Sequence, residues 1–334
     1  MNLLDEAPVC ARPAGLYCPA GDFYLDPQQP VARAVLTHAH GDHARPGSEH
    51  YWASAASGPI LAHRLPEAAC TLLDYGETCR LGAARISLHP AGHILGSAQV
   101  RIEVDDRVWV VSGDYKRQAD PSCEPFEVVP CEGFITEATF ALPVYRWPAP
   151  VEVVGQIIDW WQTNAAAGRA SLLYCYSLGK AQRVLAELQA AGARGAALPV
   201  RPAYLHSALL TLTAIYRQAG ISLWPTAPLN ALAGDGAGEL ILAPPAAEKG
   251  NWRRRLARPA TAMCSGWMRV RGNRRRRGYE RGFVLSDHAD WPALLQTVRE
   301  TGARRVLTMH GQSTELAAFL QEQGLDAAPL AGHA

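Results

Sequence analysis

The stretch Thr37-His38-Ala39-His40-Gly41-Asp42-His43 is the part of the sequence that decides the fold. It directly follows Val31–Leu36, an apolar run that predicts a β-strand. Three imidazoles and one carboxylate so close together are ordinary ligands for zinc and related divalent ions. A turn at the end of a strand can direct such side chains toward one or two ions. The stretch therefore predicts a metal centre rather than a chance polar loop.

Two later stretches extend this pattern. Ala91-Gly92-His93-Ile94-Leu95-Gly96-Ser97 places one histidine between glycines, and Ser112-Gly113-Asp114-Tyr115 places an aspartate after the predicted strand Val108–Val111. Either stretch alone is more often structural, but both follow the histidine cluster in order. Two cations about 3.5–4 Å apart lower the pKa of a shared water and stabilise the charge of an in-line displacement. The pattern predicts a hydrolase and leaves phosphodiester, thioester and lactam substrates open.

Three further predicted strands end in acidic or imidazole side chains. Phe134-Ile135-Thr136-Glu137 ends in an acid, Leu285-Ser286-Asp287-His288 ends in a histidine, and Val306-Leu307-Thr308-Met309-His310 ends in another histidine. Each residue alone can be an ordinary polar group at a strand end. In this order, after the first three motifs, the chain resembles the β-CASP branch of the metallo-β-lactamase superfamily, which contains the nucleases of RNA processing and DNA repair.

The resemblance implies a site with two divalent ions, for which we expect Zn²⁺ with Mn²⁺ as the alternative. In that site one ion has three histidine ligands, the second has two or three ligands of its own, and an aspartate bridges them. The implied ligands are His38, His40 and His93 for the first ion, Asp42, His43 and His310 for the second, and Asp114 as the bridge. The implied catalytic residues are Asp42, Glu137 and His288, with Glu137 paired to His288. A carboxylate partner raises the pKa of an imidazole and holds its proton ready for the leaving oxygen.

Further stretches narrow the resemblance. They are Gly15-Leu16-Tyr17-Cys18-Pro19-Ala20-Gly21-Asp22-Phe23, Gly179-Lys180-Ala181-Gln182-Arg183, Cys264-Ser265-Gly266-Trp267-Met268 and Ser286-Asp287-His288-Ala289-Asp290-Trp291. Together they look like the bacterial ligase-associated DNA exonuclease family, whose members are typically encoded beside an ATP-dependent DNA ligase and a helicase. The resemblance implies a DNA exonuclease that acts from a 5′ end in DNA repair. A ribonuclease of the same branch and a DNA-binding scaffold with structural metals are the alternatives, and a small-molecule hydrolase would need neither an inserted domain nor the arginines described below.

The resemblance also implies the architecture. It predicts an α/β (α+β) protein with a four-layer αββα metallo-β-lactamase core and an inserted α/β β-CASP domain. The core would comprise residues 1–148 and 272–334, and the insertion residues 149–271. The residues agree with this division, because sheet-forming runs dominate before Pro150 and strands alternate with helical patterns after it.

Basic residues are concentrated in one segment of the chain. Lys249–Arg281, called the basic segment below, holds eleven arginines, one lysine and a single acid, whereas the whole chain has a net charge of only +1. Such segregation is typical of a polyanion-binding surface, and a solvated loop is the alternative. Trp252, Trp267 and Tyr279 lie in this segment and could stack on unpaired bases.

Seven residues are expected to contact the phosphates of DNA. Five are arginines of the basic segment, and two flank the N-terminus of a predicted helix, where backbone amides favour anions. These residues are Arg271, Arg274, Arg275, Arg276, Arg277, Ser177 and Lys180.

The composition excludes two broad classes of protein. With 334 residues, 48% of them hydrophobic and 19% charged, the chain can form a sizeable core and is not a disordered protein. We find no apolar run of the roughly 18 residues that a membrane span needs, and the first residues are acidic rather than basic as in a signal peptide. We therefore expect a cytoplasmic protein with no membrane partner.

Overall fold

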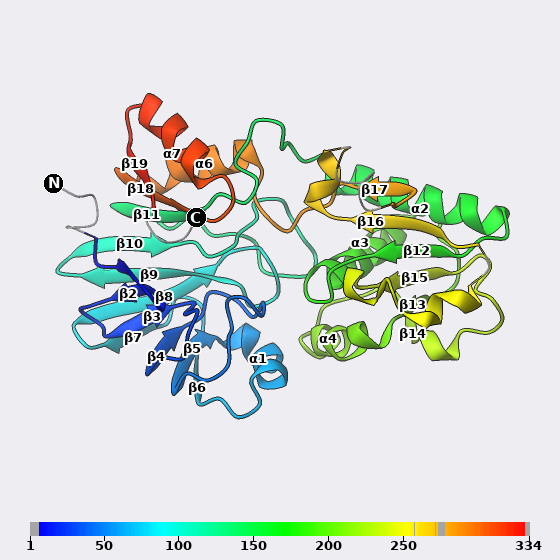
Figure 1. Cartoon of the computed structure of the whole chain (residues 1–334), viewed down its shortest axis with the longest axis horizontal. Coiled ribbons are helices and arrows are strands. Elements are labelled where there is room, and N and C mark those ends of the chain that lie inside the picture. The colour runs from blue at the N-terminus through cyan, green and yellow to red at the C-terminus, as the bar shows by residue number, and fades with distance from the viewer. Residues whose placement is uncertain (1–6, 257, 271, 273–277, 331–334) are drawn as a thin grey trace. The chain divides into compact units, whose positions relative to one another are not determined.

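The computed structural model describes residues 7–256, 258–270, 272 and 278–330 (Figure 1). The chain divides into two compact units. Unit 1 comprises residues 1–119, 123–146 and 288–334, and unit 2 comprises residues 120–122 and 147–287. Three sheets and six α-helices are described, which confirms the expected α/β class.

Unit 1 contains two sheets that pack face to face. The first has the order β1-β2-β3-β4-β5-β6, with antiparallel pairs from β1 to β3 and parallel pairs from β3 to β6. Its strands are β1 (Cys10–Arg12), β2 (Gly15–Cys18), β3 (Phe23–Leu25), β4 (Arg33–Val35), β5 (His50–Ser54) and β6 (Cys70–Leu73). Side chains such as Phe23 and Val35 from this sheet share one buried cluster with Ile102 and Trp109 from the second. Burial of this apolar surface between the sheets is the main driving force for unit 1.

The second sheet of unit 1 carries most of the site. It has the order β19-β18-β11-β10-β9-β8-β7, and the four strands β19, β18, β11 and β10 run parallel. Its strands are β7 (Thr78–Leu81), β8 (Ala84–Pro90), β9 (Ala98–Val104), β10 (Arg107–Val111), β11 (Gly133–Glu137), β18 (Arg305–Met309) and β19 (Asp326–Pro329).

Helices cover the outer faces of both sheets in unit 1. Leu294 of α6 (Trp291–Thr301) and Leu316 of α7 (Ser313–Glu322) join a second buried cluster with Phe134 and Val306 of the β7–β19 sheet. On the other side, α1 (Gly58–Arg64) follows the turn η1 (Ala55–Ser57) and lies beside β6 (Figure 1). The layers of unit 1 are therefore helix, sheet, sheet and helix.

Unit 2 is built on one fully parallel sheet of order β14-β13-β15-β12-β16-β17. Its strands are β12 (Ser171–Tyr174), β13 (Ala203–Leu205), β14 (Thr226–Pro228), β15 (Leu240–Ala243), β16 (Ala260–Cys264) and β17 (Arg281–Phe283). Its helices are α2 (Pro150–Ala166), α3 (Lys180–Ala193) and α4 (Ser207–Gln218), with the turns η2 (Leu229–Ala231), η3 (Pro245–Ala247), η4 (Asn251–Arg255) and η5 (Gly266–Arg269). The central strands are buried on both faces, which is typical of a parallel sheet.

The structure resumes unit 1 at His288, after β17 has paired with β16 in the sheet of unit 2. Among the described residues, no helix is long and apolar enough to cross a membrane.

Candidate metal centre

The predicted ligands follow strands of unit 1 whose carboxyl ends lie at one edge of the sheets. The histidine cluster 38–43 comes after β4, Asp114 after β10, and His310 directly after β18. Glu137 is the last residue of β11, and β10, β11 and β18 are parallel neighbours. Because the carboxyl ends of parallel strands share an edge, residues far apart in the sequence come together there.

Four of the predicted ligands form one compact group of donor atoms. His38 Nε2 lies 3.0 Å from His40 Nδ1, and His93 Nε2 lies 3.1 Å from the same atom. The carboxylate Oδ2 of Asp114 lies 3.6 Å from His38 Nε2 and 3.7 Å from His93 Nε2. The rings of His38 and His93 are almost fully buried, so neither is free to turn away.

A second group of donor atoms comprises Asp26, His38 and His43, so it shares His38 with the first group. His43 Nε2 is 3.6 Å from Asp114 Oδ2, so this carboxylate faces both groups. His43 Nδ1 is 2.8 Å from Oδ2 of Asp26, whose carboxylate also accepts hydrogen bonds from the backbone and hydroxyl of Thr37. A carboxylate behind a histidine fixes the orientation of the ring and raises its basicity as a ligand.

Asp26 is the functional residue that the sequence analysis missed. It follows β3 and precedes a proline, so it reads as an ordinary turn residue. Its only sequence signal is its position after a short strand, the same position that marks Asp114.

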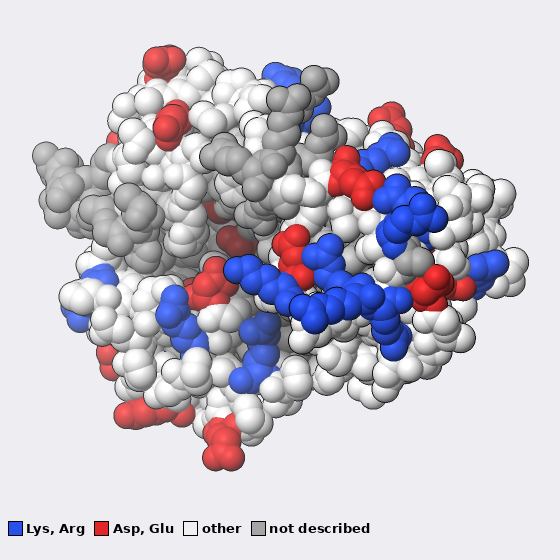
Figure 2. Space-filling view, turned by 45° about the vertical axis from the view of Figure 1, so that its right-hand side comes forward, with Lys and Arg blue, Asp and Glu red and all other residues white. Residues whose placement is uncertain are grey.

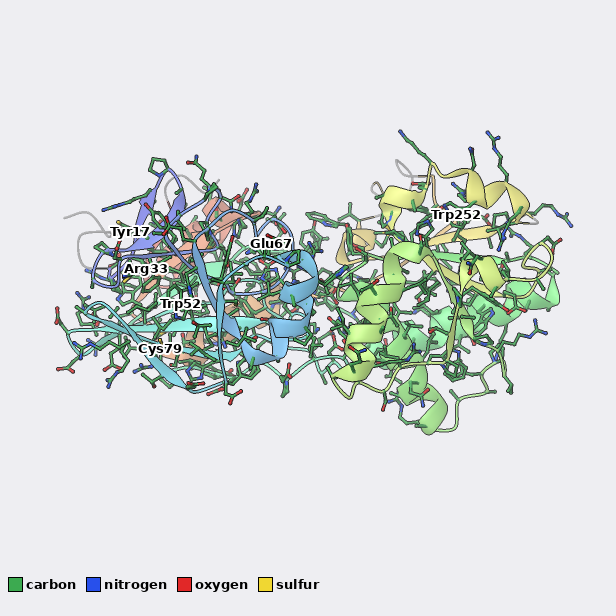
Figure 3. The ribbon with its side chains drawn as sticks, turned by 90° about the horizontal axis from the view of Figure 1, so that it is seen from below. Tyr17, Arg33, Trp52, Glu67, Cys79 and Trp252 are labelled. Carbon is green, nitrogen blue, oxygen red and sulfur yellow. The ribbon has the colours of Figure 1, made fainter. Side chains whose placement is uncertain are left out.

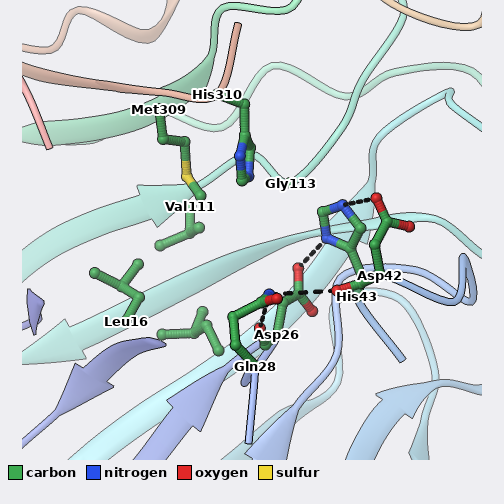
Figure 4. Close-up of a pocket in the computed structure, with 10 residues that line it drawn as sticks. Leu16, Asp26, Gln28, Asp42, His43, Val111, Gly113, Met309 and His310 are labelled. Carbon is green, nitrogen blue, oxygen red and sulfur yellow. Dashed lines mark hydrogen bonds and ion pairs between the residues drawn. The ribbon is translucent and has the colours of Figure 1, made fainter. Parts of the chain in front are cut away.

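Asp42 and His310 lie beside His43 at an open pocket of about 350 Å³ (Figure 4). The carboxylate of Asp42 is 3.9 Å from His43 Nε2, and the side chain is 75% exposed. The rings of His43 and His310 are 5.9 Å apart between centroids. The structure thus brings both residues to the second group, although neither joins the tight clusters of donor atoms among the described residues.

Burial and neighbouring charges set the pKa values in this cluster. Burial and the ring of His43 hold the pKa of His38 well below its usual range, as a neutral ligand requires. Burial also lowers the pKa of His43, but the carboxylates of Asp114 and Asp26 outweigh it and raise the pKa to about 10. Burial raises the pKa of Asp114, yet the surrounding imidazoles, His43 foremost, bring the pKa below its usual range. Positive charge beside Asp114 is therefore favoured.

These residues fit divalent metal ions by their chemistry and spacing. In a tetrahedral zinc site with bonds of 2.0–2.1 Å, neighbouring ligand atoms are about 3.3 Å apart. The nitrogen–nitrogen distances of 3.0 and 3.1 Å around His40 are close to that value. His38, His40, His93 and Asp114 could hold one ion, and His43 with Asp114 could hold another, with Asp42 and His310 nearby.

Glu137 and His288 form a pair whose donor atoms lie within 4.8 Å of a carboxylate oxygen of Asp114. His288 Nδ1 lies 3.1 and 3.0 Å from the two carboxylate oxygens of Glu137. Glu137 is buried, and its Oε1 accepts a hydrogen bond of 2.7 Å from the backbone N–H of Tyr115. The His288 ring lies 4.7 Å from the His93 ring between centroids and is 23% exposed. Glu137 therefore fixes the orientation of the His288 ring through Nδ1.

Lys180 and Ser177, which were expected to contact phosphate, both have partners within unit 2. Lys180 is buried, and its ammonium lies 2.6 Å from the carboxylate of Asp287. A phosphate would have to compete with that carboxylate, so contact through Lys180 is disfavoured. Ser177 lies in the turn between β12 and α3, where its backbone carbonyl accepts a hydrogen bond from Gln182.

Cations of the described residues gather in one band in Figure 2. The other predicted phosphate contacts, Arg271, Arg274, Arg275, Arg276 and Arg277, lie outside the described residues.

The chain has relatives among curated proteins. A probable DNA ligase of Opitutus terrae is 34% identical over 94% of this chain and 30% of its own length. A ribonuclease of Thermus thermophilus is 29% identical over 55% of this chain and 48% of its own length. The transcription termination factor FttA of Methanosarcina mazei is 28% identical over 52% of this chain and 27% of its own length. With the metal-ligand pattern, these matches decide the family. The chain belongs to the β-CASP branch of the metallo-β-lactamase superfamily.

This β-CASP chain spans between about a quarter and a half of the length of these relatives. No protein-family model matches it. Among solved structures, a protein of unknown function from Enterococcus faecalis superposes with a TM-score of 0.58 at 13% identity, over 85% of this chain and 76% of that one. At that identity the likeness concerns the fold alone.

Proposed function

We propose that the chain is a dinuclear-metal-dependent nuclease that hydrolyses phosphodiester bonds in DNA, acting as an exonuclease from a 5′ end in cytoplasmic DNA repair. The observation that carries the proposal is the contact of three imidazoles, those of His38, His93 and His43, with Asp114 Oδ2, next to the Glu137–His288 pair. Two metal ions and an acid–base pair are well suited to phosphodiester hydrolysis. A thioesterase would need neither the basic segment nor a second unit.

We assign the units accordingly. Unit 1, with its helix–sheet–sheet–helix layers, would be the αββα metallo-β-lactamase core, and unit 2 the inserted β-CASP domain. Support comes from the chain order, since unit 1 is interrupted by a parallel-sheet unit and resumes at His288. The family membership of the chain supports the same assignment.

Each residue of the site would have a distinct task. Bound Zn²⁺ or Mn²⁺ would supply a low-pKa water and neutralise charge on the phosphate. Asp26 would hold His43 in its ligand orientation through the 2.8 Å contact. Glu137, fixed by the Tyr115 amide, would hold one proton on His288 Nδ1 and stabilise the doubly protonated ring, whose Nε2–H could then pass its proton to the leaving oxygen. This arrangement makes His288 a proton donor to the leaving group.

DNA as the substrate rests on two features. The basic segment provides a surface for a polyanion, and the relative that matches 94% of this chain is named a probable DNA ligase. An ATP-dependent DNA ligase and a helicase are candidate partners by the same family resemblance. A ribonuclease is the second candidate, because several relatives that match about a third to a half of the chain carry ribonuclease names.

Labelled oligonucleotides test the proposal directly. Matched DNA and RNA strands, labelled at either end and in single- and double-stranded form, are incubated with the protein and a panel of divalent ions. We expect metal-dependent release of nucleotides from the 5′ end of DNA. Faster cleavage of RNA would replace the first candidate by the second. Metal binding without turnover on any strand would leave a DNA-binding scaffold.

A further inference from the structure

Unit 2 carries a pocket of about 300 Å³ at the carboxyl ends of its parallel strands. Leu205 ends β13 and Pro228 ends β14, and these two residues are register partners. In parallel α/β sheets this edge is where ligands bind, and 300 Å³ is at the small end of ligand pockets. The pocket is lined by Leu205, His206, Ser207, Leu210, Pro228, Leu229, Asn230, Trp252 and Arg255.

Two aromatic rings with fixed positions form one wall of this pocket. The rings of His206 and Trp252 lie 5.4 Å apart between centroids at 56°. The Trp252 indole N–H donates a hydrogen bond of 2.9 Å to the carbonyl of Ala247 (Figure 3 labels Trp252). His206 Nδ1 accepts a hydrogen bond from the backbone N–H of Ala208 at the start of α4. Because both rings are held by the backbone, a planar ligand could stack on them at little entropic cost.

The chemistry of His206 adds a hydrogen-bond donor to the wall. Burial lowers the pKa of His206, so the ring is neutral at pH 7. When Nδ1 of a neutral imidazole accepts, the proton is on Nε2, which is then a donor. A planar ligand with a hydrogen-bond acceptor on its ring matches this arrangement, and every base carries one. His206 has no role in the metal centre of unit 1.

The rim of the pocket is cationic. Arg255 is exposed, and its guanidinium donates to the backbone carbonyl of Leu229, which holds it at the rim. Arg254 and Lys249 are exposed close by in the chain. Arg255 could therefore contact a phosphate next to a ligand in the pocket.

We propose that this pocket binds one unpaired base of a nucleic-acid strand, which stacks on Trp252 and His206 while Arg255 contacts a flanking phosphate. The proposal rests on the proposed function, because it supplies a strand-holding subsite for the nuclease. It predicts a preference for single strands with intact bases and tolerance of base identity, since every base has a stacking face.

Equilibrium binding separates base stacking from charge. The full chain with its metals is titrated with a phosphorothioate-linked oligothymidylate, which resists hydrolysis, and with a strand of equal length and charge made of abasic residues. We expect the wild type to prefer the intact strand by about fivefold or more, the lower end for one base stacked on an aromatic ring. Trp252→Leu should abolish that preference and leave binding to the abasic strand unchanged. Arg255→Gln should weaken both strands equally.

Matched variants guard against misfolding. Trp224→Leu is the control, because Trp224 is another half-buried tryptophan of unit 2 whose N–H donates to a backbone carbonyl, and it does not line the pocket. Trp252→Phe should keep the preference, and His206→Asn should reduce it while still capping α4.

The outcomes separate this proposal from the proposed function. Equal affinity of the wild type for both strands, or an undiminished preference in folded Trp252→Leu, would overturn the base pocket even in an active nuclease. A base preference that depends on Trp252 in a chain without nuclease activity would support the pocket and reject only the nuclease. Equally tight binding of free thymidine monophosphate would identify a nucleotide site instead and overturn the strand-holding role.

Discussion

The two units place charged side chains at the carboxyl ends of parallel strands in opposite ways. In unit 1, Asp114 is surrounded by imidazoles, which accept a metal ion readily. In unit 2, Asp287 lies 2.6 Å from the Lys180 ammonium and 3.4 Å from the Arg183 guanidinium. Arg183 also lies 3.2 Å from Asp120. Unit 2 therefore neutralises its buried acids with its own cations, whereas Asp114 of unit 1 lies among imidazoles that could hold metal ions. We expect the paired acids of unit 2 to support folding and the imidazole-lined acid of unit 1 to support catalysis.

The largest effect is expected from removing the acid that the two donor groups share. Asp114→Ala should abolish detectable turnover and release both ions, because its carboxylate faces both groups. Metal analysis of the purified protein and a nuclease assay measure the two effects. Asp159→Ala, an exposed acid on α2, is the control. An active variant that still contains two ions per chain would contradict the bridging role.

The next largest effect concerns His288. His288→Ala should slow turnover by about 10²–10⁴-fold, the usual contribution of general acid–base catalysis, with metal content unchanged. His89→Ala is a matched control, because His89 lies 3.1 Å from Glu127 in a similar histidine–glutamate pair away from the ligands. Loss of a metal ion from His288→Ala would make His288 a ligand rather than a proton donor.

In unit 2, removing a buried charged side chain should lower the stability of the fold rather than the rate of the reaction. Lys180→Met should lower the free energy of unfolding by about 3–5 kcal/mol, because it leaves Asp287 buried without its closest cation. Urea unfolding measures the change. Arg201→Met removes an exposed ion pair with Glu239 in the same unit and should cost no more than about 1 kcal/mol. Similar costs for the two variants would remove the contrast between buried and exposed pairs.

The smallest effect is expected from the carboxylate behind His43. Asp26→Asn should weaken metal affinity by about 10–100-fold, since the amide no longer stabilises the ring as a ligand. Competition with a chelator measures the affinity. Asp22→Asn is the control, because the Asp22 carboxylate accepts a hydrogen bond from the Tyr17 hydroxyl rather than from a histidine. Equal affinities of the two variants would show that Asp26 has no part in metal binding.

The sequence predicted elements with strong local patterns more accurately than those formed by tertiary pairing. The predicted strand Val108–Val111 lies within β10 (Arg107–Val111), and the predicted strand that ends at Glu137 coincides with β11 (Gly133–Glu137). The strands β1, β2 and β3 were not predicted, because three- or four-residue strands show no clear alternation. The strand β17 contains a glycine beside the basic segment, and only its pairing with β16 assigns it to unit 2.

The site was predictable where residue type alone identifies a ligand. Histidines and aspartates in the expected order indicated the donor groups, and the expected Glu137–His288 contact is present at 3.0 Å. Asp26 and the buried partner of Lys180 depend on contacts between distant segments, which spacing cannot show.

At the end of β18, one residue has a backbone conformation that lowers stability and a side chain that lies at the candidate metal centre. His310 has a φ of 62°, in the left-handed region that costs a residue with a Cβ about 1 kcal/mol or more. Gly311 has a φ of 54°, and a Cβ added there would lie 2.5 Å from the carbonyl oxygen of Ala138. The histidine therefore cannot be moved to position 311 to relieve the strain at position 310. In a library randomised at position 310, selection for thermal stability alone would therefore enrich glycine and asparagine. Selection for activity would enrich histidine. The difference between the two selections would show that the side chain at position 310 is needed for activity and not for folding.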